Sequence, residues 1–191
     1  MTRILLVETA IDGNVAPPLW GWPDGPGTHG AAVVDVLTTH APDVPWFWFA
    51  VCDETGVWKP EDALDAVLAA IEPGDIVLVE LQGEGGQPLD FHDEAAHRFD
   101  AMVARGAVVV LPAGNGGKEI PEARSKAVLV GALNRSGRAD QRSCFGDAVT
   151  VWAEGTQAAG LSGTSRAAAL YAARSARKDA ELRLHARLSE P

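Results

Sequence analysis

The sequence predicts an α/β fold of three layers, in which a mainly parallel β-sheet lies between helices. Six short apolar runs alternate with stretches of helical periodicity, and this alternation is typical of sheets built from βαβ units. The run AVVVLPA at 107–113 has no polar alternation, as expected of a parallel strand covered on both faces. We find no repeat, low-complexity tract or interdomain linker, so residues 1–191 are expected to form one domain.

The apolar runs and the periodic stretches set the expected element order. Strands are expected at 3–8, 45–51, 75–81, 107–113, 127–133 and 148–153. Helices are expected at 29–40, 60–72 and 90–106, with a long one from about 165 to the late 180s. In such sheets ligands bind outside the carboxyl ends of the strands. Polar residues that follow strands or open helices are therefore the candidates for a functional site.

Composition excludes several classes of partner. A net charge of −10 argues against nucleic acid, because duplex binding depends on Lys and Arg at the phosphates. No run approaches the roughly 20 apolar residues of a membrane span, and no signal peptide is visible, so a cytoplasmic protein is expected. Cys52 and Cys144 form no spacing motif; they pair only if the fold brings them together, and two buried thiols are favoured.

Three motifs that suggest cofactors or other nucleophiles fail on inspection. GNGGKE at 114–119 is not a phosphate loop, because the required first glycine falls on Pro112 and no Ser or Thr follows Lys118. GLSGT at 160–164 lacks the final glycine of a hydrolase nucleophile elbow. HDEAAH at 92–97 spaces its histidines by five rather than the four that suit zinc on one helix face. We expect no cofactor and no metal.

Four polar residues stand where a site is expected. Glu8 ends the first strand and His29 opens the first helix, in GTHG. Asn115 follows the fourth strand, in PAGNGG, and Ser165 opens the last helix, in SGTS. Acyl transfer by serine needs a nucleophile, a base, an acid that orients the base, and oxyanion donors. Ser165, His29, Glu8 and Asn115 can fill these roles in that order.

Each assignment has a simpler structural alternative. Ser165 can be only a helix N-cap, although Thr164 or Ser162 can cap as well. Asn115 can supply a turn, since Asn-Gly is a common turn pair. A lone histidine that opens a helix, like His29, is usually a surface or capping residue.

Together, however, the motifs resemble the subtilisin-like serine peptidases (subtilases) over nearly the whole chain and in the same order. ILLVETAID is similar to the family's acid strand, GTHGAAVVDVL to its histidine helix, GAVVVLPAGNGG to its A-G-N segment and SGTSRAAA to its G-T-S-x-A motif. DIVLVELQGEGG stands where the substrate-binding strand lies. The resemblance implies that the substrate backbone is bound by Leu81, Gln82, Gly83, Ala113 and Gly114.

The departures from the family pattern concern mainly the acid. Glu8 stands where the family has Asp, and one extra methylene requires the strand or His29 to shift. A branch of the family that carries Glu here has an E-x-Q end to the substrate strand, like the residues 80–82. Asp12 and Asp24 are the alternative orienting acids. The chain is also short for the family, which implies that surface insertions and calcium loops are trimmed away.

The resemblance implies a serine endopeptidase that hydrolyses peptide bonds and takes a peptide or protein as substrate. Two alternatives stay open: a subtilisin-like domain that binds a peptide or partner without cutting it, and a peptide acyl-transferase or ligase that uses the same residues. Glu84 near the substrate strand suggests an acidic cleft that prefers basic or polar peptides. The physiological substrate, such as a peptide that requires maturation, and the oligomeric state are left open by the sequence.

Overall fold

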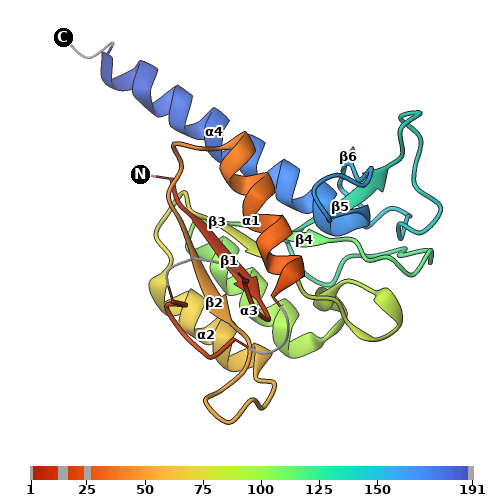
Figure 1. Ribbon diagram of the computed structural model, residues 1–191, viewed down its shortest axis with the longest axis horizontal. Coiled ribbons are helices and arrows are strands. Elements are labelled where there is room, and N and C mark those ends of the chain that lie inside the picture. Colours follow the sequence, from red (N-terminus) through yellow and green to blue (C-terminus); the bar gives the residue numbers. More distant parts are fainter. Residues whose placement is uncertain (1, 13–16, 24–26, 189–191) are drawn as a thin grey trace.

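A computed structural model describes residues 2–12, 17–23 and 27–188, with side chains up to Glu181. Six parallel strands form one sheet in the order β2-β1-β3-β4-β5-β6 (Figure 1). This confirms the predicted three-layer α/β fold. The strands are β1 (Ile4–Glu8), β2 (Trp46–Ala50), β3 (Ile76–Val79), β4 (Val108–Pro112), β5 (Val128–Leu133) and β6 (Val151–Glu154). The α-helices are α1 (Thr28–His40), α2 (Pro60–Ala70), α3 (Asp93–Ala104) and α4 (Gly163–Leu188).

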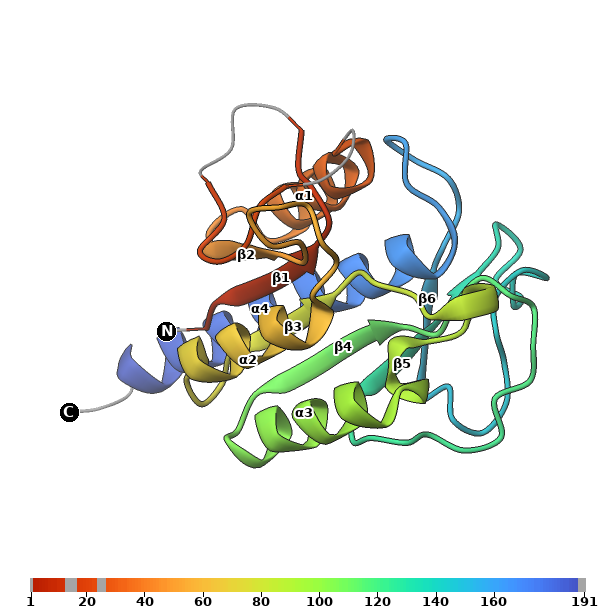
Figure 2. The same cartoon turned by 90° about the horizontal axis from the view of Figure 1, so that it is seen from below.

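Helices cover both faces of the sheet, and strand periodicity decides which side chains they meet. α1 and α4 pack on one face, while α2 and α3 pack on the other (Figure 2). Ile4 and Leu6 of β1 point toward α1 and α4, whereas Leu5 and Val7 point toward α2 and α3. Because successive residues of a strand alternate between faces, Glu8 continues the row that faces α1 and α4. Both faces are apolar, as the unalternating runs predict.

The connections change direction next to β1. After β1 the chain crosses α1 to β2, on one side of β1, and then returns through α2 to β3 on the other side. After β3 it continues through α3, on the opposite face from α1. A crevice forms where neighbouring strands send their connections to opposite faces. The topology therefore places a binding crevice at the carboxyl ends of β1 and β3.

Two elements begin differently from the sequence prediction. The last strand begins at Val151 rather than at 148, because the chain turns there and the Val149 N–H donates to the Gly146 carbonyl. The helix expected at 90–106 is split into a short 3-10 turn, Leu89–Phe91, and α3. Asp90 in this turn is fully buried and accepts from the backbone N–H of Arg124. A long-range contact thus replaces the first turn of the expected helix.

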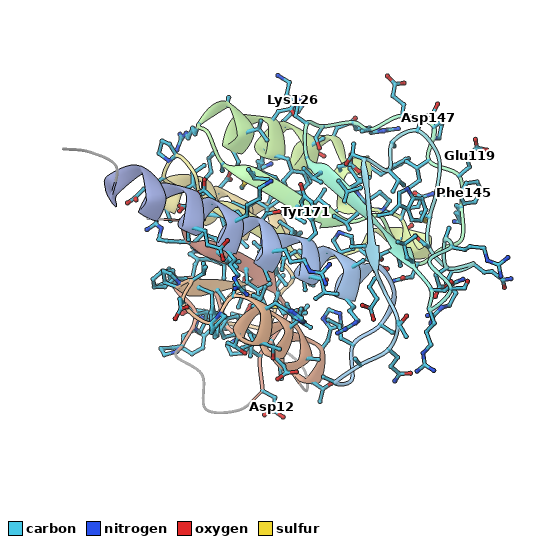
Figure 3. The ribbon with its side chains drawn as sticks, turned by 90° about the horizontal axis from the view of Figure 1, so that it is seen from above. Asp12, Glu119, Lys126, Phe145, Asp147 and Tyr171 are labelled. Atoms are coloured by element: carbon cyan, nitrogen blue, oxygen red, sulfur yellow. The ribbon has the colours of Figure 1, made fainter. Side chains whose placement is uncertain are left out.

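The loops after β4 and β5 lie together at one end of the molecule. Glu119 and Phe145 form a parallel bridge between these loops, and Figure 3 shows both side chains there with Asp147. Cys144 packs in the core beneath the loops, whereas Cys52 lies between the sheet and α2 and α3. The two thiols therefore occupy separate parts of the core. None of the helices in the described part of the chain has both the length and the apolar character of a membrane span.

Candidate active site

Two helices begin over the crevice, on the face of the sheet that carries Glu8. α1 begins at Thr28 and brings His29, and α4 begins at Gly163 and brings Ser165. The loop after β4 brings Asn115 to the same place, where its side-chain oxygen meets the start of α4. All four residues predicted for acyl transfer thus come from segments at the carboxyl ends of the strands: the end of β1, the loop after β4 and the starts of α1 and α4. No hydrogen bond joins the Ser165 hydroxyl to His29 within the described residues.

Glu8 and His29 form a direct pair. Oε2 of Glu8 lies 2.7 Å from Nδ1 of His29, and a carboxylate only accepts, so Nδ1 carries the hydrogen. The other oxygen, Oε1, accepts from the N–H and the hydroxyl of Thr9 at 2.7 and 2.9 Å. The Glu8 side chain is 3% exposed and that of His29 is 45% exposed, so the ring reaches from a buried anchor toward solvent. The unbonded Nε2 is the basic nitrogen.

The Glu8 contact changes the acidity of His29. The hydrogen bond to Glu8 raises the pKa of His29, partial burial opposes the shift, and the charges of Glu8 and Glu80 raise the pKa further. Stabilisation of the imidazolium is what a general base needs when it takes a proton. Of the alternative acids, Asp12 does not take this place beside Nδ1, and Asp24 lies outside the described residues.

Glycine in GTHG allows α1 to approach β1 closely. A side chain at Gly30 would place its Cβ 2.2 Å from the carbonyl oxygen of Ala10 and 2.9 Å from Cγ of Glu8. The helix therefore packs directly against the Glu8 side chain, with no room for a larger residue.

Asn115 holds the beginning of α4. Its Oδ1 accepts from the backbone N–H of Thr164 at 3.0 Å, so it caps the helix from a distant loop. Gly163 has a φ of 69°, and a Cβ there would lie 2.4 Å from Oδ1. With Oδ1 engaged, the Nδ2 amide of the exposed Asn115 is directed away from the cap. This arrangement leaves an amide donor beside the first turn of α4.

Ser165 lies in the first turn of α4 rather than before it, so it is not the N-cap residue. The residue is 5% exposed, with the first-turn N–H groups and the positive end of the helix dipole around it. These groups favour negative charge that develops next to the hydroxyl.

Glu80 is a second buried acid that sequence reasoning assigned no role. It follows β3 directly, and its N–H donates to the carbonyl of Val7 at 3.0 Å. Val7 and Val79 are register partners, so Glu8 and Glu80 come side by side on one face. Burial raises the pKa of Glu80 to about 8; His29 and the Ser165 hydroxyl oppose the shift, and the Glu8 charge adds to it. The sequence does carry a signal for this burial. Glu80 follows Ile76 and Leu78 at the two-residue spacing of a strand, so it faces the same side of the sheet as these apolar residues.

The predicted substrate-binding residues lie in two adjoining loops. Leu81 and Ala113 are buried, and Gln82 and Gly83 are half-buried. The Gly83 N–H already donates to Gln87 within its own loop. Gly114 packs so closely on this loop that a Cβ would lie 2.1 Å from the Gly86 carbonyl oxygen. The two segments form one surface beside the start of α4.

His29 also lines an open cavity at the surface. It measures about 620 Å³ and lies between the start of α1 and the turn at Ala159–Gly160. Asp12 and Asp35 contribute its acidic lining, and Figure 3 shows Asp12 at the outer edge of the molecule near α1. No group of three His, Cys, Asp or Glu side chains in the described part of the chain is arranged to hold a metal ion.

The architecture is that of the subtilisin-like serine proteases. Superposition on a cold-adapted subtilisin-like serine proteinase gives a TM-score of 0.73 at 19% identity, over 94% of this chain and 76% of that one. A mutant of the protease domain of PatA gives 0.72 at 18% identity, over 96% and 81%. A lanthipeptide protease gives 0.73 at 18% identity, over 96% and 75%. No protein-family model and no curated protein matches the chain. The likeness therefore establishes the fold.

Proposed function

We propose that the chain is a serine endopeptidase of subtilisin type, formed by residues 1–191 as one peptidase domain. The observation that carries this proposal is the 2.7 Å contact between Glu8 Oε2 and His29 Nδ1. A surface or capping histidine needs no buried carboxylate fixed by two further hydrogen bonds. Such an arrangement is the orienting half of a catalytic triad, and it supports Glu8 as the acid in place of Asp.

In the proposed reaction, Ser165 Oγ attacks the peptide carbonyl carbon while its proton passes to Nε2 of His29. Glu8 stabilises the resulting imidazolium through Nδ1–H. The carbonyl oxygen takes up the negative charge and accepts from Nδ2 of Asn115 and from the Ser165 N–H. His29 then protonates the departing amine. A water molecule deprotonated by His29 attacks the ester, and His29 returns this proton to Ser165 Oγ as the acid is released. Glu8 only orients and stabilises His29, and Asn115 with the start of α4 stabilises the oxyanion.

We propose a peptide in extended form as substrate, bound beside Gln82 and the loop that holds Gly114. Because the Gly83 N–H is engaged within its own loop, strand-like pairing would use the backbone groups of residues 81–82. Two proteins of this fold have names that point to peptide processing, the prenylagaramide maturation protease PagA and a lanthipeptide protease. We infer peptide maturation as the class of role.

The acidic lining beside His29 supports a preference for substrates with a basic residue near the scissile bond. Asp12 and Asp35 line the cavity next to His29, and Glu84 is exposed in the loop after β3. A peptide library should show preferential cleavage next to Lys or Arg. Cleavage without any such preference would remove the acidic cleft from the proposal and leave the endopeptidase intact.

A fluorophosphonate probe tests the nucleophile directly, because it reacts with an activated serine. The native protein should be labelled at Ser165, Ser165→Ala should not react, and His29→Ala should react much more slowly. Ser162→Ala is the matched control, since it removes a hydroxyl from the same loop without touching the proposed nucleophile. A native protein that stays unlabelled would favour the binding-domain alternative. A labelled protein that transfers its acyl group to added amines faster than to water would favour the ligase.

A further inference from the structure

Glu80 lies where it can act on both the proposed nucleophile, Ser165, and the proposed base, His29. Glu80 is 6% exposed. It lies next to Glu8 on the neighbouring strand, on the face of the sheet that α1 and α4 cover. The groups that act on its acidity come from each element around it: Glu8 on β1, His29 on α1 and the Ser165 hydroxyl on α4.

Neither carboxyl oxygen of Glu80 has a hydrogen-bond partner among the described residues. An ionised carboxylate without partners in an apolar setting is very costly, and such a group stays neutral instead. The neighbouring Glu8 carboxylate adds repulsion, since like charges on adjacent strands disfavour a second ionisation. A neutral Glu80 holds one O–H donor, and the Ser165 hydroxyl is the nearby group that can accept from it.

We propose that Glu80 is a positioning residue: as a neutral carboxylic acid it donates a hydrogen bond to Ser165 Oγ and turns the serine hydrogen toward Nε2 of His29. This inference rests on the proposed function. A hydroxyl accepts on its lone pairs and donates its own hydrogen, so one bond from Glu80 leaves the donor free for His29. Carboxylic acids held neutral by an apolar site act as hydrogen-bond donors in other enzymes. The Glu80 proton stays on Glu80 throughout, while the Ser165 proton moves to His29.

The neutral state of Glu80 also keeps His29 available as a base. An ionised Glu80 would set two carboxylates around the imidazole, and its charge raises the pKa of His29. The imidazolium would then persist at higher pH and could not accept the serine proton. Because a neutral Glu80 places no charge beside His29, replacing it with the neutral Gln should leave the pKa of His29 in place.

The test compares Glu80→Gln, which keeps a donor, with Glu80→Leu, which does not. Glu61→Gln is the control, because it removes an exposed carboxylate on α2, across the sheet from the site. Two measurements are made on the full chain: the rate of fluorophosphonate labelling against pH, and the His29 titration midpoint by NMR, assigned with His29→Ala. Circular dichroism checks that each variant is folded.

We expect Glu80→Leu to label on the order of tenfold to a hundredfold more slowly than the native protein, as for other misplaced reacting groups. Glu80→Gln should recover most of this loss and keep the acid limb of the labelling profile at its native pH. Both Glu80 variants, like Glu61→Gln, should leave the His29 midpoint in place, because they remove no negative charge from a neutral Glu80. Native rates and profile in Glu80→Leu, or a Glu80→Gln variant as slow as Glu80→Leu, would overturn the proposal.

The NMR midpoint separates this inference from the proposed function. If the native protein is not labelled at all, the peptidase proposal fails, yet the His29 midpoint still reports whether Glu80 is neutral. A midpoint that falls in folded Glu80→Gln would show an ionised Glu80 beside His29 and would overturn the Glu80 inference on its own. If Glu80→Leu does not fold, the comparison of Glu80→Gln with the native protein decides the question.

Discussion

Glu80 makes the stability of the protein depend on pH in a direction that can be measured without any activity assay. Its pKa in the folded protein is about 8, against an ordinary value of 4.5. The native state therefore keeps a proton that the unfolded chain loses above pH 4.5. Stability falls with rising pH wherever the folded state binds more protons, so the cost is absent below pH 4.5 and is incurred progressively up to about pH 8.

The size of the effect follows from that interval. Each pH unit between the two pKa values changes the free energy of unfolding by about 1.4 kcal/mol, which gives about 5 kcal/mol in total. This is a large part of the stability of a typical domain, which is about 5 to 15 kcal/mol, or about 0.1 kcal/mol per residue. The charge of His29 opposes the shift, and the pKa of about 8 already includes this effect.

Urea unfolding of the native protein and of Glu80→Gln, at intervals from pH 5 to pH 9, measures the effect as a difference. Glu80→Gln has no proton to lose, so it should gain stability relative to the native protein as the pH rises, and the difference should level off above about pH 8. The exposed control Glu61→Gln should give a difference that is flat with pH. A Glu80→Gln difference that is equally flat would refute the buried, neutral carboxyl.

Three further predictions concern the start of α4 and the opposite end of the sheet. Asn115→Asp keeps an oxygen for the Thr164 N–H but loses the amide donor, so thermal unfolding should change little while probe labelling falls by about 10²–10³; a fully active variant would remove Asn115 from the oxyanion hole. Gly163→Ala, at a φ of 69° and with Cβ 2.4 Å from Asn115 Oδ1, should lower the free energy of unfolding by at least about 1–2 kcal/mol and slow labelling; native values of both would contradict the close approach. Arg3→Ala removes two hydrogen bonds from the fully buried Asp75 and should lower the free energy of unfolding in urea by about 3–5 kcal/mol. A decrease below about 1 kcal/mol would show that Asp75 is satisfied without Arg3.

The strand and helix order follows from local pattern, and the structure confirms it. The apolar runs at 107–113 and 127–133 are strands within one residue of the expected bounds. The start of the third helix was predicted wrongly because a distant contact outweighs local preference. Asp90 is an example, because its burial against the Arg124 segment breaks up the start of a helix that periodicity alone extends.

The sequence by itself determined the α/β class, the element order and four of the candidate site residues, since each of these depends on spacing or on a motif within a few positions. Only the tertiary structure decided that Glu8 meets His29 and that Asn115 caps α4. It alone brought Glu80 beside both Glu8 and Ser165. These contacts depend on the register of neighbouring strands and on two helices that begin at the same edge. Such distances across the fold are set by packing, which no local stretch of sequence encodes.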